Sequence, residues 1–73
     1  MQIEITGYEP EQYKPVAERA ARHFAGLSGY RSVKVEIEPS GDDGFLEFHC
    51  TGKGGHIAES YLYDIRLDKL HHV

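Results

Sequence analysis

Apolar and polar residues alternate with a period of two in three short stretches of the chain. In residues 2–6, Ile3 and Ile5 point one way while the polar residues point the other, and residues 32–38 and 45–51 repeat the alternation. This period is typical of a strand that is buried on one face. We therefore predict three strands. The last two form a hairpin, because residues 39–44 are dense in turn formers.

A helical pattern lies between the first two strands. Pro15 fits the first turn of a helix, where its missing N–H group is not needed, and Gly26 and Gly29 supply a stop signal. The apolar residues between them recur at three- and four-residue steps, which marks one face of a helix. These residues are Val16, Ala17, Ala20, Ala21, Phe24 and Leu27.

Residues 57–70 fit two different patterns. Ile57, Ala58, Tyr61, Leu62 and Ile65 have helical spacing, whereas Tyr61, Tyr63, Ile65 and Leu67 have strand spacing. We predict a helix over residues 57–70, because a single short helix would leave much of one sheet face wet; a fourth strand is the alternative. The expected fold is one α+β domain over residues 1–73, β-α-β-β-α, with a three-stranded sheet and two helices on one face.

Composition limits the kinds of partner. The chain of 73 residues carries 12 acidic and 8 basic residues, a formal net charge of −4, and its basic residues are scattered. Direct binding of nucleic acid is disfavoured, because neutralising phosphates requires clustered cations. No apolar stretch approaches the length of a membrane span, so we expect no membrane association. The single cysteine, Cys50, cannot form an internal disulfide, and a cytoplasmic location is expected.

No set of residues predicts a catalytic, metal or cofactor site. The stretch Gly52-Lys53-Gly54-Gly55 lacks the spacing of a phosphate-binding loop and is interpreted as a flexible turn. His49 and Cys50 are adjacent strand residues and point to opposite faces, so with His56 they do not form a metal site. Cys50 also falls on the apolar face of its strand, where a thiol is usually inert. We therefore expect a non-enzymatic protein.

The uncovered face of the sheet is the candidate binding surface. If the three strands lie side by side, Glu4, Glu36, Glu38 and Glu47 project from it together, and Asp42 and Asp43 sit at its rim. Such an array imitates the charge of a nucleic-acid backbone and would attract a basic groove of a partner protein. The expected function is that of a stoichiometric inhibitor that occupies a nucleic-acid-binding surface. The tyrosines, above all those of the tail, are a second candidate interface.

Two resemblances add to this picture. Residues 1–7 (MQIEITG) resemble the first strand of ribosome hibernation-promoting factors, and residues 64–70 (DIRLDKL) look like the last helix of that family. The resemblance implies a β-α-β-β-β-α order and, as an alternative function, a ribosome-associated role. However, this chain is acidic and the expected fold is one strand shorter. In size and charge the chain also resembles small phage-encoded anti-CRISPR inhibitors, some of which mimic nucleic acids.

Self-association is a further expectation. In the predicted three-stranded sheet, residues 45–51 form an edge strand with unpaired backbone groups, which readily pair with another chain. A two-fold homodimer through this edge or through the predicted last helix is therefore an alternative to a monomer. Such a dimer should leave Glu36 and Glu38 outward, because like charges repel.

Overall fold

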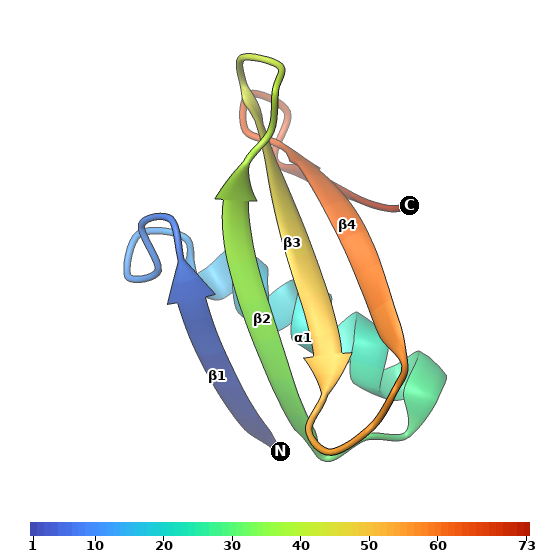
Figure 1. The fold of residues 1–73 in the computed structure, drawn as a ribbon. Coiled ribbons are helices and arrows are strands. Elements are labelled where there is room, and N and C mark those ends of the chain that lie inside the picture. The colour runs from blue at the N-terminus through green and yellow to red at the C-terminus, as the bar shows by residue number, and fades with distance from the viewer.

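A computed structural model describes residues 1–73 and shows a five-stranded sheet and one helix. In Figure 1 the helix lies across one face of the sheet. The strand order in the sheet follows the chain, β1-β2-β3-β4-β5; β1 is parallel to β2 and the other neighbours are antiparallel. The helix is neither long nor apolar enough to cross a membrane. The elements are β1 (Gln2–Gly7), α1 (Lys14–Ser28), β2 (Ser32–Pro39), β3 (Phe45–Gly52), β4 (Ala58–Asp64) and β5 (Lys69–His72).

Helix α1 confirms the helix predicted from the apolar spacing. Pro15 occupies its first turn, and Gly29 ends it in the left-handed conformation with φ 81°, donating its N–H to the carbonyl of Ala25 at 2.8 Å. The face turned to the sheet is made mostly of alanines, and Ala17 and Ala20 are fully buried. Small side chains let the helix axis approach the sheet closely.

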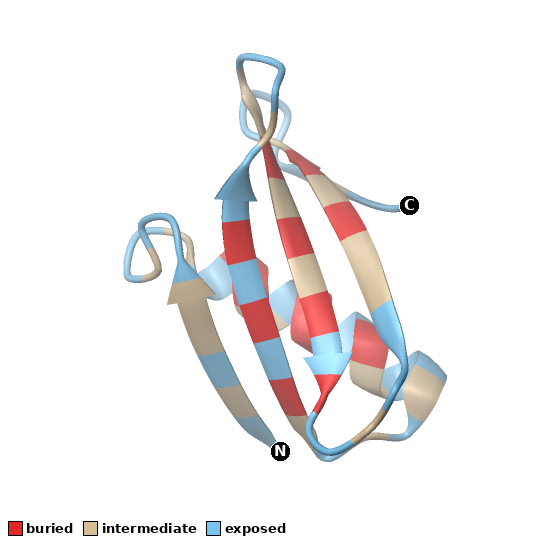
Figure 2. Ribbon diagram, viewed as in Figure 1, coloured by how far each residue is buried: buried red, intermediate tan, exposed pale blue.

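The core lies between α1 and the sheet, and each of the inner strands contributes every second residue to it. Figure 2 shows this alternation as buried bands along β2 and β3. The buried apolar side chains of these strands are those of Val33, Val35, Ile37, Leu46, Phe48 and Cys50. The predicted inward and outward positions of residues 32–38 and 45–51 are confirmed.

The predicted helix over residues 57–70 is wrong. This segment forms β4, a turn and β5 instead. Strand pairing decided the choice: β4 pairs with β3 from Thr51↔Ala58 to Phe45↔Asp64 and satisfies an edge that a helix would leave unpaired. The strand also buries Tyr61 and Tyr63, with 2% and 6% exposed, whereas Ile57 and Ile65 of the helical pattern are 49% and 38% exposed.

The fold class changes with this segment. The sheet has five strands, not three, and α1 is the sole helix. The alternative of a fourth strand was closer for residues 58–64, although β5 was not foreseen. Strand β3 lies inside the sheet between β2 and β4, so residues 45–51 are not an edge, and the predicted last helix does not exist. Both interfaces expected for a homodimer are therefore unavailable.

The turn between β4 and β5 is fastened to the helix by Asp68. Its backbone has φ 52°, and its carboxylate accepts hydrogen bonds from the hydroxyl of Tyr63 at 2.7 Å and from the guanidinium of Arg19 at 3.0 Å. The Tyr63 bond and then the Arg19 bond favour the charged form and lower the pKa of Asp68 below its usual value of 3.8. A polar contact thus holds the last hairpin against α1.

Candidate functional site

The face of the sheet opposite α1 carries polar side chains on every strand. In Figure 1 this face is turned to the viewer and α1 lies behind it. Strand register fixes which side chains are neighbours, because residues directly opposite on antiparallel strands project to the same side. We call this surface the uncovered face; the residues discussed below are Glu4, Lys34, Glu36, Glu38, Glu47, His49, Thr51 and Ser60.

One end of the uncovered face gathers most of the predicted binding residues. Glu38 lies directly opposite Glu47, and Glu36 lies opposite His49. Asp42 and Asp43 are exposed in the turn that joins β2 to β3 at this end (Figure 2). We call these residues the acidic end: Glu36, Glu38, Asp42, Asp43 and Glu47.

The remaining predicted residue, Glu4, is not part of the acidic end. It lies on the edge strand β1 with Lys34 as its partner on β2. Here a hollow of about 550 Å³ opens between the strands and the turn after β3; its lining includes Glu4, Lys34, Lys53 and the hydroxyl residue Thr51. The two ends of the uncovered face therefore differ in charge, with both lysines of the hollow far along the strands from Glu38 and Glu47.

The glycine-rich turn beside this hollow is shaped by packing against Tyr30. A Cβ atom added at Gly52 would lie 2.3 Å from the Tyr30 ring, and one added at Gly55 would meet the Tyr30 hydroxyl. Gly54 has φ 78°, which favours glycine. Close packing against Tyr30 thus explains why residues 52 and 55 are glycines, and the positive φ explains the glycine at residue 54. The turn is closely packed on an aromatic side chain, which the sequence did not reveal.

His49 occupies a position at the acidic end that sequence reasoning missed. Its Nε2 atom lies 3.4 Å from a carboxylate oxygen of Glu38, and its Nδ1 atom lies 2.9 Å from the hydroxyl of Ser60 on β4. In the sequence, His49 stands out only as a neighbour of Cys50 and near His56. The hairpin register was the signal that could have found the site, since it places Glu38, Glu47 and His49 on one side of two paired strands.

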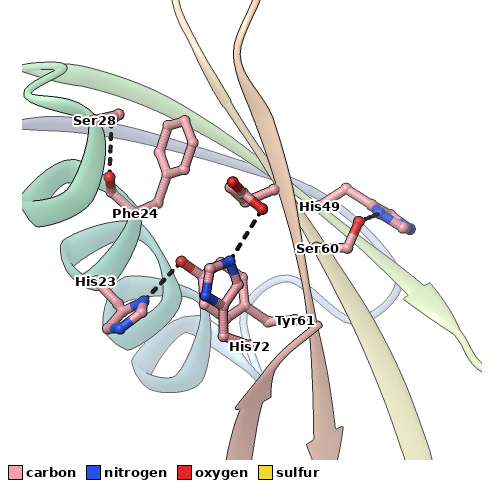
Figure 3. A network of polar contacts seen from close by, with 8 residues as sticks. His23, Phe24, Ser28, His49, Ser60, Tyr61 and His72 are labelled. Carbon is pink, nitrogen blue, oxygen red and sulfur yellow. Dashed lines mark hydrogen bonds and ion pairs between the residues drawn. The ribbon is translucent and has the colours of Figure 1, made fainter.

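A second polar network lies on the helix side of the sheet (Figure 3). His23 of α1 places Nδ1 2.8 Å from the hydroxyl of Tyr61, and the ring of His72 stacks on Tyr61 with centroids 4.8 Å apart. Nε2 of His72 lies 3.0 Å from Glu59. Burial, and then the nearby Cys50 and Glu59, raise the pKa of Tyr61 to about 12. A phenol that stays neutral and hydrogen-bonded serves packing here, because a buried hydroxyl needs a partner.

Burial makes Cys50 and the tyrosines of the tail poor candidates for functional residues. Cys50 is fully buried, and burial raises the pKa of its thiol to about 12, so it is a poor nucleophile near neutral pH. Tyr61 and Tyr63 lie in the core, so the tyrosine-rich tail does not offer the interface considered above. Tyr8, with 45% of its surface exposed, is the most accessible aromatic residue.

Comparison with protein-family models, with curated proteins and with solved structures gave no match. The chain's own geometry therefore carries the functional proposal.

Proposed function

We propose that this protein binds a basic surface of a partner protein through the acidic end of its uncovered face, and thereby keeps nucleic acid away from that surface. The observation that supports the proposal is the register of the β2–β3 hairpin. It gathers Glu36, Glu38 and Glu47 on one side of the sheet, beside a turn that carries Asp42 and Asp43. Such an inhibitor would act by occupancy and would need no chemical step.

The charge of the acidic end is available to a partner. The ion pairs of the chain join Arg19 to Asp68, His49 to Glu38, and His72 to Glu59. No lysine or arginine side chain is paired with a carboxylate of the acidic end. An unneutralised cluster of one sign raises the local potential and speeds the approach of an oppositely charged surface.

The spacing of these carboxylates also suits a flat, repetitive partner surface. Residues two apart on a strand are separated by roughly 7 Å, and neighbouring strands by about 5 Å. Glu36 and Glu38 follow the first spacing, and the opposed pair Glu38 and Glu47 follows the second. The lysines at the far end of the uncovered face would orient the partner, because a basic surface would be attracted to one end and repelled from the other.

The test begins by identifying the partner through cross-linking of the full chain in cell extract, followed by binding measurements with the purified partner. Replacing Glu36→Lys and Glu38→Lys together should weaken binding at least about tenfold at low salt. The loss should shrink between about 50 mM and about 300 mM salt, since screening weakens exposed charges. Competition with a nucleic acid that the partner binds should be lost in parallel.

A matched charge reversal provides the control. Glu11→Lys with Glu18→Lys changes the net charge by the same amount, but these residues lie in the connector before α1 and on α1 itself. This variant should bind within a factor of about three of the original chain. Equal weakening in both variants, or no weakening in the Glu36/Glu38 variant, would show that the acidic end is not the interface.

The ribosome-associated alternative rests on the opening strand. Residues 1–7 include β1, whereas residues 64–70, likened to the family's last helix, include the end of β4, a turn and the start of β5. Cosedimentation with ribosomal particles at low salt separates the two functions. Absence from the ribosomal pellet would remove this alternative, and salt-resistant cosedimentation would replace the inhibitor proposal.

A homodimer formed by strand pairing would have to use one of the true edges of the sheet, β1 or β5. Strand β1 is the better candidate because it has six residues and β5 has four. Light scattering at moderate salt decides the question. A mass that stays near 8.3 kDa at all accessible concentrations would rule out self-association.

A further inference from the structure

Three potential metal ligands from two neighbouring strands converge at the acidic end. Glu38 of β2 and Glu47 and His49 of β3 each offer one donor atom, and these atoms lie within 4.8 Å of one another. The ligands sit on the inner strands of the sheet, which have partners on both sides. A site on such strands is better fixed than a site on a loop.

The observed geometry matches a tetrahedral ion without rearrangement of the backbone. In tetrahedral Zn²⁺ sites the metal lies about 2.0–2.2 Å from nitrogen and oxygen ligands, which places any two ligands roughly 3.4 Å apart. Nε2 of His49 already lies 3.4 Å from Oε2 of Glu38. Only Glu47 would have to adjust, by rotation of a half-buried side chain.

A residue outside the set orients the imidazole. Nδ1 of His49 lies 2.9 Å from the hydroxyl of Ser60 on β4, which leaves Nε2 facing the two carboxylates (Figure 3 shows the His49–Ser60 pair). Metal-binding histidines usually have their second ring nitrogen held by such a partner, which fixes the orientation and the tautomer. Ser60 is therefore a positioning residue.

A cation would also relieve the repulsion between the two carboxylates of the site. Glu38 and Glu47 lie directly opposite each other, and like charges in this relation destabilise a sheet. No lysine or arginine is paired with either of them, and the contact of Glu38 with His49 is an ion pair only when the imidazole is protonated. A divalent ion would neutralise both carboxylates at once and leave the imidazole neutral.

We propose that Glu38, Glu47 and His49 form a binding site for a divalent transition-metal ion, with Zn²⁺ as the best-fitting ion. One imidazole and two carboxylates suit zinc, and the outward side of the site leaves a fourth position for water. The half-exposed setting favours reversible binding. The inference does not rest on the proposed function, because metal binding is measured without a partner; a bound ion would lower the negative charge of the acidic end and so weaken its attraction for a basic surface.

The direct test is titration of the full chain with ZnCl₂ at about pH 7.5 by calorimetry, with NMR of the imidazole nitrogens. We expect about one Zn²⁺ per chain and a shift at Nε2 of His49. His49→Ala should abolish this binding, Glu47→Gln should weaken it at least about tenfold, and Ser60→Ala should weaken it about 10–100-fold. These substitutions lie on the surface side of the sheet, and circular dichroism checks that each variant is folded.

Two other histidines supply the matched control. His56 and His71 are exposed and lie outside the set, so His56→Ala and His71→Ala should bind Zn²⁺ as the original chain does. Zn²⁺ affinity that survives His49→Ala, or that is lost in His71→Ala, would show adventitious binding by the terminal histidines and overturn the proposal. Absence of binding by the original chain would overturn it as well.

Discussion

Replacing Gly52 by alanine should destabilise the fold through one identifiable contact. The added Cβ would lie 2.3–2.4 Å from three ring atoms of Tyr30, whereas ordinary contact begins at 3.4 Å. The ring would have to move by roughly 1 Å. It cannot do so freely, because it stacks on the fully buried Phe24 with centroids 6.0 Å apart. Overpacking of this kind typically destabilises by about 1–3 kcal/mol.

A double-mutant cycle isolates this contact. Tyr30→Ala removes the ring, so Gly52→Ala should then change the free energy of unfolding by less than about 0.5 kcal/mol. The coupling energy between the two positions should therefore be about 1–3 kcal/mol. A chain of this size should have a free energy of unfolding of about 4–11 kcal/mol, which leaves the single variants measurable.

The free energy of unfolding is measured by urea denaturation, followed by far-ultraviolet circular dichroism, for the original chain, the two single variants and the double variant. Low temperature and a constant slope against urea keep the comparison valid. The reasoning would be refuted if Gly52→Ala had the same effect with and without the Tyr30 ring, since a backbone effect at residue 52 does not depend on that ring.

Three further measurements test the core, the last turn and the backbone. Cys50 should resist iodoacetamide near pH 8, because a thiol pKa of about 12 instead of 9.0 lowers the thiolate fraction about a thousandfold; rapid labelling of the folded chain would contradict its burial. The lowered pKa of Asp68 means that its carboxylate stabilises the fold above pH 3.8 and loses this effect as pH falls through the folded-state pKa. The stability difference between the original chain and Asp68→Asn should therefore narrow in acid, as thermal unfolding at several pH values will show. Gly7→Ala should destabilise by about 3 kcal/mol or more, because φ is 100° and the new Cβ would lie 2.2 Å from the carbonyl oxygen of Ile37. The Cβ atom of Gly26→Ala would meet no atom within 4 Å, so this substitution should instead stabilise α1 by about 0.5–1 kcal/mol in urea denaturation. Destabilisation by both substitutions, or stabilisation by both, would contradict the different roles of the two glycines.

Local patterns predicted the first two-thirds of the fold and failed in the last third. The alternation in residues 32–38 and 45–51 has one periodic interpretation, and the structure follows it. In residues 57–70, Tyr61 fits both a helical and a strand pattern, so periodicity cannot decide. The decision came from β3, whose free edge pairs with residues 58–64. That is a long-range requirement, invisible to any local window.

The candidate site shows the same division between local and long-range information. Alternation alone placed Glu36, Glu38 and Glu47 on one side of the sheet, and the register bears this out. The separation of Glu4 beside Lys34 depends on which strands are neighbours, and the contact of His49 with Ser60 depends on β4 being a strand. Neither relation follows from local alternation, and the second also requires residues 58–64 to form a strand.

Strand β1 has a consequence for the order in which the molecule opens. Its backbone pairs with β2 alone, although Ile3 and Ile5 also pack against the core, and the N–H groups of Gln2 and Tyr8 point toward β2. Since the direction alternates along a strand, the N–H groups of Ile3, Ile5 and Gly7 face solvent. Amide protons at these three positions should exchange with deuterium almost as fast as in an unfolded chain, whereas those of the inner strands should exchange only on global unfolding. The sheet thus has an antiparallel block and a first strand whose backbone is hydrogen-bonded on one side only.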